Sequence, residues 1–248
     1  MLRSNPMFDS VNINYDSIST DRATYSGITI KTLILLGIAG LAGILAGVFL
    51  TRSEYLPLFY GLLIFGAIIE FITVIVGRSH SKYAKLCGII YSIIEGMLLG
   101  TVTALANMYY EGVAVLAVAG TGLVFVVCVI MFSCGMMRDT RKLSKIGIVL
   151  LLSLLLSTLM IAICNAFNIG GVGTLISNST GIAILVTVGF IVFASIMLFL
   201  NFNEAAYYVQ SGATKDFEWI AAFGFLVSIL YIYFEVLRLA LIILDRKN

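Results

Sequence analysis

The sequence predicts an all-α polytopic membrane protein with seven transmembrane helices. Its 248 residues are 60% hydrophobic and 11% charged, with a mean hydropathy of +1.07, and this composition is typical of membrane proteins. A helix needs roughly 20 apolar residues to cross the hydrocarbon core, because its backbone N–H and C=O groups have to be paired within the segment. The runs that meet this requirement are 31–50, 56–77, 83–108, 112–137, 146–169, 179–200 and 219–244.

The polar beginning of the chain sets the predicted domain organisation. Residues 1–27 are rich in Asn, Ser and Asp and are predicted to form a cytoplasmic tail, followed by one helical domain over residues 28–248. The connections between the apolar runs are short, so no separate soluble domain is expected. A cleaved signal peptide would place its apolar region nearer the N-terminus than residue 31.

Basic residues orient the predicted bundle. Eleven Lys and Arg residues lie in the tail and in the even-numbered connections, against three on the other side. The positive-inside rule therefore predicts a cytoplasmic N-terminus and, after seven crossings, an external C-terminus. A six-span arrangement with a re-entrant last segment stays open, because Asp245, Arg246 and Lys247 would be better placed in the cytoplasm. The net charge of +2 reflects this asymmetry and does not indicate nucleic-acid binding.

Small residues and cysteines inside the runs indicate packing rather than chemistry. Ala39, Gly43 and Gly47 recur every four residues in the first run, and Gly96 and Gly100 do so in the third, a spacing that lets membrane helices approach closely. The four cysteines form no CxxC motif and have no neighbouring histidine ligands. We therefore expect no zinc or haem site and no cofactor.

Ionisable and amide residues in the apolar runs are the candidate functional residues. A charge at the bilayer centre costs about 3 kcal/mol, so such residues usually face a cavity or a partner. A structural explanation exists for some of them: Glu235 and Arg238 can neutralise each other three residues apart on one helix, and Glu70 can pair with Arg238 or stay protonated. Taken together, they favour one polar pathway through the bundle. The candidates inside the runs are Glu70, Glu95, Glu235 and Arg238, with Asn201 and Glu204 at the border of the sixth.

A pathway of this composition suits cations. Carboxylate and amide oxygens are ligands for protons, Ca²⁺ and other hard ions, and Glu235 and Asn201 are the expected ligands. No HExxH or GxSxG motif and no Asp pair inside a run supports an enzyme, and the last run lacks the Lys that a retinal protein needs. Prolines occur only at positions 6 and 57, which argues against the broken helices of secondary transporters.

Several blocks of the sequence resemble one family of membrane proteins, the Bax inhibitor-1/YccA-like family, in its bacterial branch with a longer N-terminal tail. The resemblance covers nearly the whole chain. Its blocks are RSNPMF (residues 3–8), ATYSGITIKTLILL (23–36), YSIIEGMLLG (91–100), LNFNEA (200–205) and FEWIAAFGFLVSILYIYFEVLRL (217–239).

This resemblance implies a fold in which six helices surround the last one, and a pH-sensitive Ca²⁺ leak in a bacterial inner membrane. It further implies an acid late in the sixth helix that shares a proton with an acid on the seventh and pairs with a basic residue at the end of the second. In this sequence those positions correspond to Asn201, Glu235 and Arg78, and Glu95 corresponds to a Glu-Gly pair of the family.

Asn201 departs from the family pattern. An amide does not titrate, although it can offer a carbonyl oxygen to a cation and two N–H donors to a carboxylate such as Glu235. We therefore expect a weaker pH response, with Glu204 as the nearest substitute acid. The expected function is a Ca²⁺ leak channel in contact with lipid. The alternatives are a non-conducting regulator that binds membrane-protein partners, such as proteases or stress-response proteins, and a cation/proton antiporter.

Overall fold

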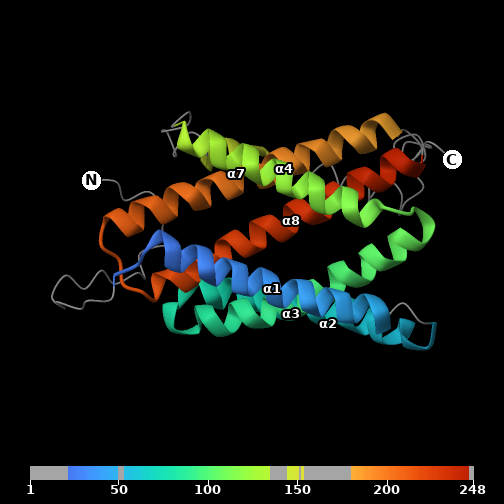
Figure 1. The fold of residues 1–248 in the computed structure, drawn as a ribbon, viewed down its shortest axis with the longest axis horizontal. Coiled ribbons are helices and arrows are strands. Elements are labelled where there is room, and N and C mark those ends of the chain that lie inside the picture. Colours follow the sequence, from blue (N-terminus) through green and yellow to red (C-terminus); the bar gives the residue numbers. More distant parts are fainter. Residues whose placement is uncertain (1–21, 50–52, 135–143, 151, 154–179, 246–248) are drawn as a thin grey trace. The chain divides into compact units, whose positions relative to one another are not determined.

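The computed structural model describes residues 22–49, 53–134, 144–150, 152–153 and 180–245 (Figure 1). The regular structure in these residues is helical, and the only β contact among them is an isolated bridge between Arg22 and Thr214. The elements are α1 (Tyr25–Phe49), the 3₁₀-helix η2 (Ser53–Tyr55), α2 (Leu56–Ser79), α3 (Ser81–Tyr109), α4 (Val113–Ser133), α7 (Thr180–Gln210) and α8 (Phe217–Asp245).

Six helices in the described part of the chain are long and apolar enough to cross a membrane. They correspond to six of the seven predicted crossings, so the prediction of an all-α polytopic membrane protein is confirmed. Of the remaining predicted crossing, 146–169, only the beginning is described, as a helical stretch at 144–150 and 152–153. The tail up to residue 21 lies outside the described residues.

The described helices belong to two compact units, and α7 and α8 contribute to both. Unit 1 contains residues 1–109 and 201–230, and unit 2 contains residues 110–200 and 231–248. In unit 1, the first half of α8 lies in the core, where Phe223 and Leu226 pack with Leu35 of α1 and Tyr91 of α3.

In unit 2, the second half of α8 contributes buried side chains. The ring of Tyr231 packs edge-on against Phe190 and Phe193 of α7, with centroids 6.5 and 6.3 Å away. Ile232 and Leu237 are at most 1% exposed. The last helix therefore supplies core residues to each unit.

Glycines determine how closely α1 and α3 pack. A Cβ atom added at Gly96 would clash with the backbone of Ala39, and one added at Gly100 would clash with the backbone of Gly43. These are the small residues that the sequence pattern singles out, and the predicted close approach is confirmed.

Helix α7 extends ten residues beyond the apolar run predicted from the sequence. The run ends at Leu200, whereas the helix continues to Gln210. It stops in a Schellman motif, in which Gly212 adopts a φ of 75° and the N–H of Ala213 donates to the carbonyl of Tyr208 at 3.0 Å. Because the helix continues, Asn201 and Glu204 lie one turn apart on it.

Candidate functional site

A polar cluster in unit 1 joins three helices. Arg78, in the last turn of α2, donates from Nη2 to Oδ1 of Asn201 on α7 at 3.3 Å. The Nδ2 of Asn201 donates to the carbonyl of Gly224 at 2.9 Å and to Oγ of Ser228 at 2.8 Å, both on α8. We call Arg78, Asn201, Gly224 and Ser228 the amide latch.

Apart from Arg78, which is half-buried, the amide latch is buried, and both N–H donors of its central amide are used. Asn201 is 9% exposed and Ser228 is 7% exposed. Gly224 allows this approach because it has no side chain: a Cβ atom there would lie 3.3 Å from both Arg78 Nη2 and Asn201 Oδ1. Since unpaired buried polar groups are costly, the bonds of Asn201 hold α7 against α8 at this level.

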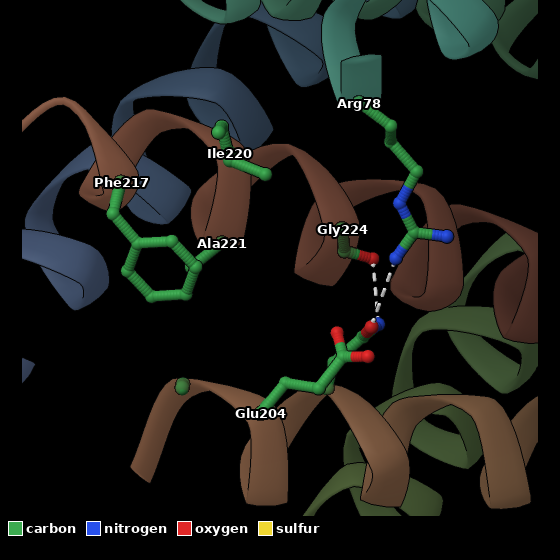
Figure 2. Close-up of a pocket in the computed structure, with 8 residues that line it drawn as sticks. Arg78, Glu204, Phe217, Ile220, Ala221 and Gly224 are labelled. Atoms are coloured by element: carbon green, nitrogen blue, oxygen red, sulfur yellow. Dashed lines mark hydrogen bonds between the residues drawn. The ribbon is translucent and has the colours of Figure 1, made fainter. Parts of the chain in front are cut away.

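Glu204 lies beside the amide latch. It lines a cavity of about 10 Å³ together with Arg78, Asn201 and Gly224, a space that can just hold one water molecule. Figure 2 shows the Glu204 side chain rising from α7 toward the level at which the Arg78 guanidinium descends from α2, next to Gly224. The positive charge of Arg78 attracts the carboxylate form of Glu204.

The structure brings together two of the three positions that the family resemblance implied. Arg78 and Asn201 are hydrogen-bonded, but the α8 side chain that bonds to Asn201 is that of Ser228 and not that of Glu235. Glu235 lies seven residues further along α8, roughly 10 Å along the helix axis. Both donors of the Asn201 amide are engaged by Gly224 and Ser228, so the Asn201–Glu235 hydrogen bond considered from the sequence is corrected to an Asn201–Ser228 bond.

Glu235 belongs to a separate cluster in unit 2. Its side chain is 3% exposed, and Oε2 lies 3.8 Å from Nη1 of Arg238, so the ion pair considered as a structural alternative is present. The Tyr231 hydroxyl, four residues earlier on α8, is a further polar neighbour of this carboxyl group. Oε2 itself has no hydrogen-bond partner, because 3.8 Å is too long for one.

Glu70 and Glu95 form a second acidic cluster, within unit 1. The Glu70 carboxyl group on α2 and the Glu95 carboxyl group on α3 are electrostatic neighbours, so the ionisable neighbour of Glu70 is Glu95. The Oε1 atom of Glu70 is buried without a hydrogen-bond partner. Since ionised carboxylates only accept hydrogen bonds, a bond between the two requires a proton on one of them.

A preformed metal site of three or more His, Cys, Asp or Glu side chains does not occur in the part of the chain that the structure describes. The predicted cation ligand Glu235 is therefore not a member of such a group. Asn201 has the guanidinium of Arg78 as its neighbour, and Glu235 has that of Arg238.

Sequence reasoning missed two residues that join helices. Ser228 gave no signal, because a hydroxyl in an apolar helix usually bonds to its own backbone, as Ser92 and Thr101 do. Glu218 lies at the edge of the last apolar run. It is 2% exposed and accepts hydrogen bonds from the Thr24 N–H at 2.8 Å and from Lys31 at 2.7 Å. These bonds tie the start of α1 to the start of α8.

Comparison with known proteins gives the family. A family model described as Bax inhibitor 1 like matches residues 5–245. Among curated proteins and among solved structures, the chain has no match. The family match covers nearly all of the chain, including every described helix and each of the clusters above. The chain is therefore a polytopic membrane protein that belongs to the Bax inhibitor 1 like family.

Proposed function

We propose that this protein is a cation leak channel, with Ca²⁺ as the favoured ion, and that the amide latch holds it closed. The observation that carries the proposal is the set of three hydrogen bonds by which Asn201 joins α2, α7 and α8 inside the membrane-spanning part of the chain. Buried polar groups among spanning helices generally mark ion pathways or the contacts that control them.

The latch opposes a cation through the charge of Arg78. A Ca²⁺ ion bound to Asn201 Oδ1 would sit at about 2.4 Å from that oxygen. Since the guanidinium nitrogen is 3.3 Å from the same oxygen, the two positive charges would be within about 6 Å of each other, where repulsion in a poorly solvated site is strong. Conduction therefore requires Arg78 to leave Asn201.

Asn201 makes this latch insensitive to pH. Its amide donates to the Gly224 carbonyl in the way that a protonated carboxyl group would, but it cannot lose that donor when the pH rises. A chain with an acid at this position would lose the bond on ionisation. We therefore propose that the native latch stays in the state that an acid would occupy at low pH.

The acidic clusters supply the remaining oxygen ligands of the proposed pathway. Glu235 is the strongest candidate for transient cation binding, because its Oε2 atom has no hydrogen-bond partner. The charge of Glu235 is balanced by Arg238. Glu70 and Glu95 offer two further carboxyl groups. The surplus of basic residues in the even-numbered connections supports a cytoplasmic N-terminus.

The test is Ca²⁺ flux into liposomes that contain the native protein or Arg78→Gln. Removal of the guanidinium frees Asn201 from α2 and removes the repulsive charge, so we expect a several-fold higher flux. Lys82→Gln is the matched control, because it removes the same charge from an exposed side chain close to the same helix ends, and its flux should equal that of the native protein.

Two results would redirect the proposal. Flux equal to that of empty liposomes for all three proteins would favour the non-conducting regulator, which acts through membrane-protein partners. Flux that follows an imposed proton gradient would favour the cation/proton antiporter.

A further inference from the structure

The single tryptophan of the chain lies between two lysines at one end of unit 1. Trp219 is in the first turn of α8. The ammonium group of Lys31, from α1, is 4.9 Å from its ring centroid, and that of Lys85, from α3, is 5.4 Å away. Both distances are within the range of cation–π attraction.

The two lysines differ in how their charges are balanced. Lys31 is 15% exposed and forms a 2.7 Å ion pair with Glu218, so its charge is neutralised. Lys85 is exposed, and no carboxylate lies within ion-pair distance of it in the described part of the chain. Its only described contact of this kind is the Trp219 ring, which leaves a positive charge directed outward at this point.

This charge lies at the level where phospholipid headgroups are expected. The spanning helices α1, α3 and α8 all begin near here, at Tyr25, Ser81 and Phe217, and tryptophan is enriched at membrane interfaces. Leu86, directly after Lys85, is 57% exposed and Tyr83 is 54% exposed. The Lys85 ammonium group, which can bind an anion, therefore lies next to exposed apolar side chains.

We propose that Lys85 and Trp219 form a binding site for the headgroup of an anionic phospholipid. The lipid phosphate accepts hydrogen bonds from the Lys85 ammonium group while its acyl chain packs along the exposed apolar side chains of α3. A phospholipid supplies both the negative charge and the apolar chain that this surface fits. This site is separate from the amide latch and does not depend on the ion pathway.

Trp219 provides a direct readout, because the emission of the purified protein comes from this one indole. The protein in neutral detergent micelles is titrated with phosphatidylglycerol, with phosphatidylcholine and with inorganic phosphate. We expect saturable change in Trp219 emission with phosphatidylglycerol only. An equal response to phosphatidylcholine would overturn the requirement for an anionic lipid, and an equal response to inorganic phosphate would overturn the lipid as the source of the phosphate.

Three variants distinguish a specific site from general electrostatic attraction. Lys85→Gln should weaken the phosphatidylglycerol response several-fold, and Lys85→Arg should restore it. Lys82→Gln removes the same charge one turn earlier on α3, where no ring contact occurs, and should leave the response near the native value. Equal weakening by Lys85→Gln and Lys82→Gln, or no weakening by Lys85→Gln, would overturn the proposal. Native-like elution of each variant in size exclusion shows that it is folded.

Discussion

Asn201 and Glu235 are both buried polar residues that contact α8 or lie on it, yet their surroundings differ in kind. Asn201 is neutral, uses both of its N–H donors on α8 and accepts from Arg78. Glu235 is an acid whose Oε2 has no hydrogen bond and whose cationic neighbour Arg238 is 43% exposed and 3.8 Å away. The first arrangement is suited to holding helices together, and the second to exchanging a proton or a cation.

The difference in hydrogen bonding indicates that Asn201 and Glu235 have different roles, one in holding helices together and one in binding ions. Buried polar groups whose hydrogen bonds are all satisfied make a structure rigid. A buried polar atom without a hydrogen-bond partner is instead typical of a site that binds an ion or another ligand. Under the proposed function, the amide latch would hold the channel closed and Glu235 would bind ions transiently. The following predictions test whether the two residues respond differently to substitution.

Asn201→Leu should have the largest effect on stability. Leucine has a similar volume but leaves the Gly224 carbonyl, the Ser228 hydroxyl and the Arg78 guanidinium without their partner, which should lower the free energy of unfolding by about 2–4 kcal/mol. Denaturant or thermal unfolding in detergent measures this. A midpoint equal to that of the native protein would show that these bonds do not hold α7 to α8.

The sequence predicted the fold and part of this latch for clear physical reasons. Apolar length identified six described spanning helices, because a spanning helix has no alternative means of pairing its backbone. Asn201 was found because an amide is conspicuous at the border of an apolar run, whereas Arg78 was found through the family resemblance.

Ser228 could not be found in the same way. The partner of an amide is set by which face of α8 packs against α7, and a serine that bonds to another helix looks the same in sequence as one that bonds to its own carbonyl. Glu235 was the more conspicuous residue on α8, but it is seven positions away from the one that contacts Asn201. Glu218 was missed because its partners, Thr24 and Lys31, are nearly 200 positions away in sequence.

Glu235→Gln should show the opposite pattern to Asn201→Leu. The substitution keeps the shape of the side chain and removes a buried charge that is only weakly paired, so the unfolding midpoint should change little. Ca²⁺ flux, if Glu235 binds the passing ion, should fall several-fold in liposomes. A large loss of stability with unchanged flux would make the Glu235–Arg238 pair structural and reverse the comparison.

Ser228→Ala should have the smallest effect. It removes one acceptor of the Asn201 amide and leaves the bond to the Gly224 carbonyl, so we expect a loss of about 1 kcal/mol in the free energy of unfolding and a modest rise in flux. Ser195→Ala is the control, because the Ser195 hydroxyl donates to the Ile191 carbonyl of its own helix. Equal effects of the two variants would show that the bond between Asn201 and Ser228 adds nothing to closure.

The most direct test of the central claim is the Ca²⁺ flux of native protein and Asn201→Asp, each at one pH below and one pH above neutrality. A protonated aspartate can donate to the Gly224 carbonyl as the amide does, and it loses that donor when it ionises. We predict that the Ca²⁺ flux of Asn201→Asp differs clearly between the two pH values, while that of the native protein changes much less. A native flux that varies with pH as strongly as that of Asn201→Asp would contradict the account, as would a variant that responds no more than the native protein.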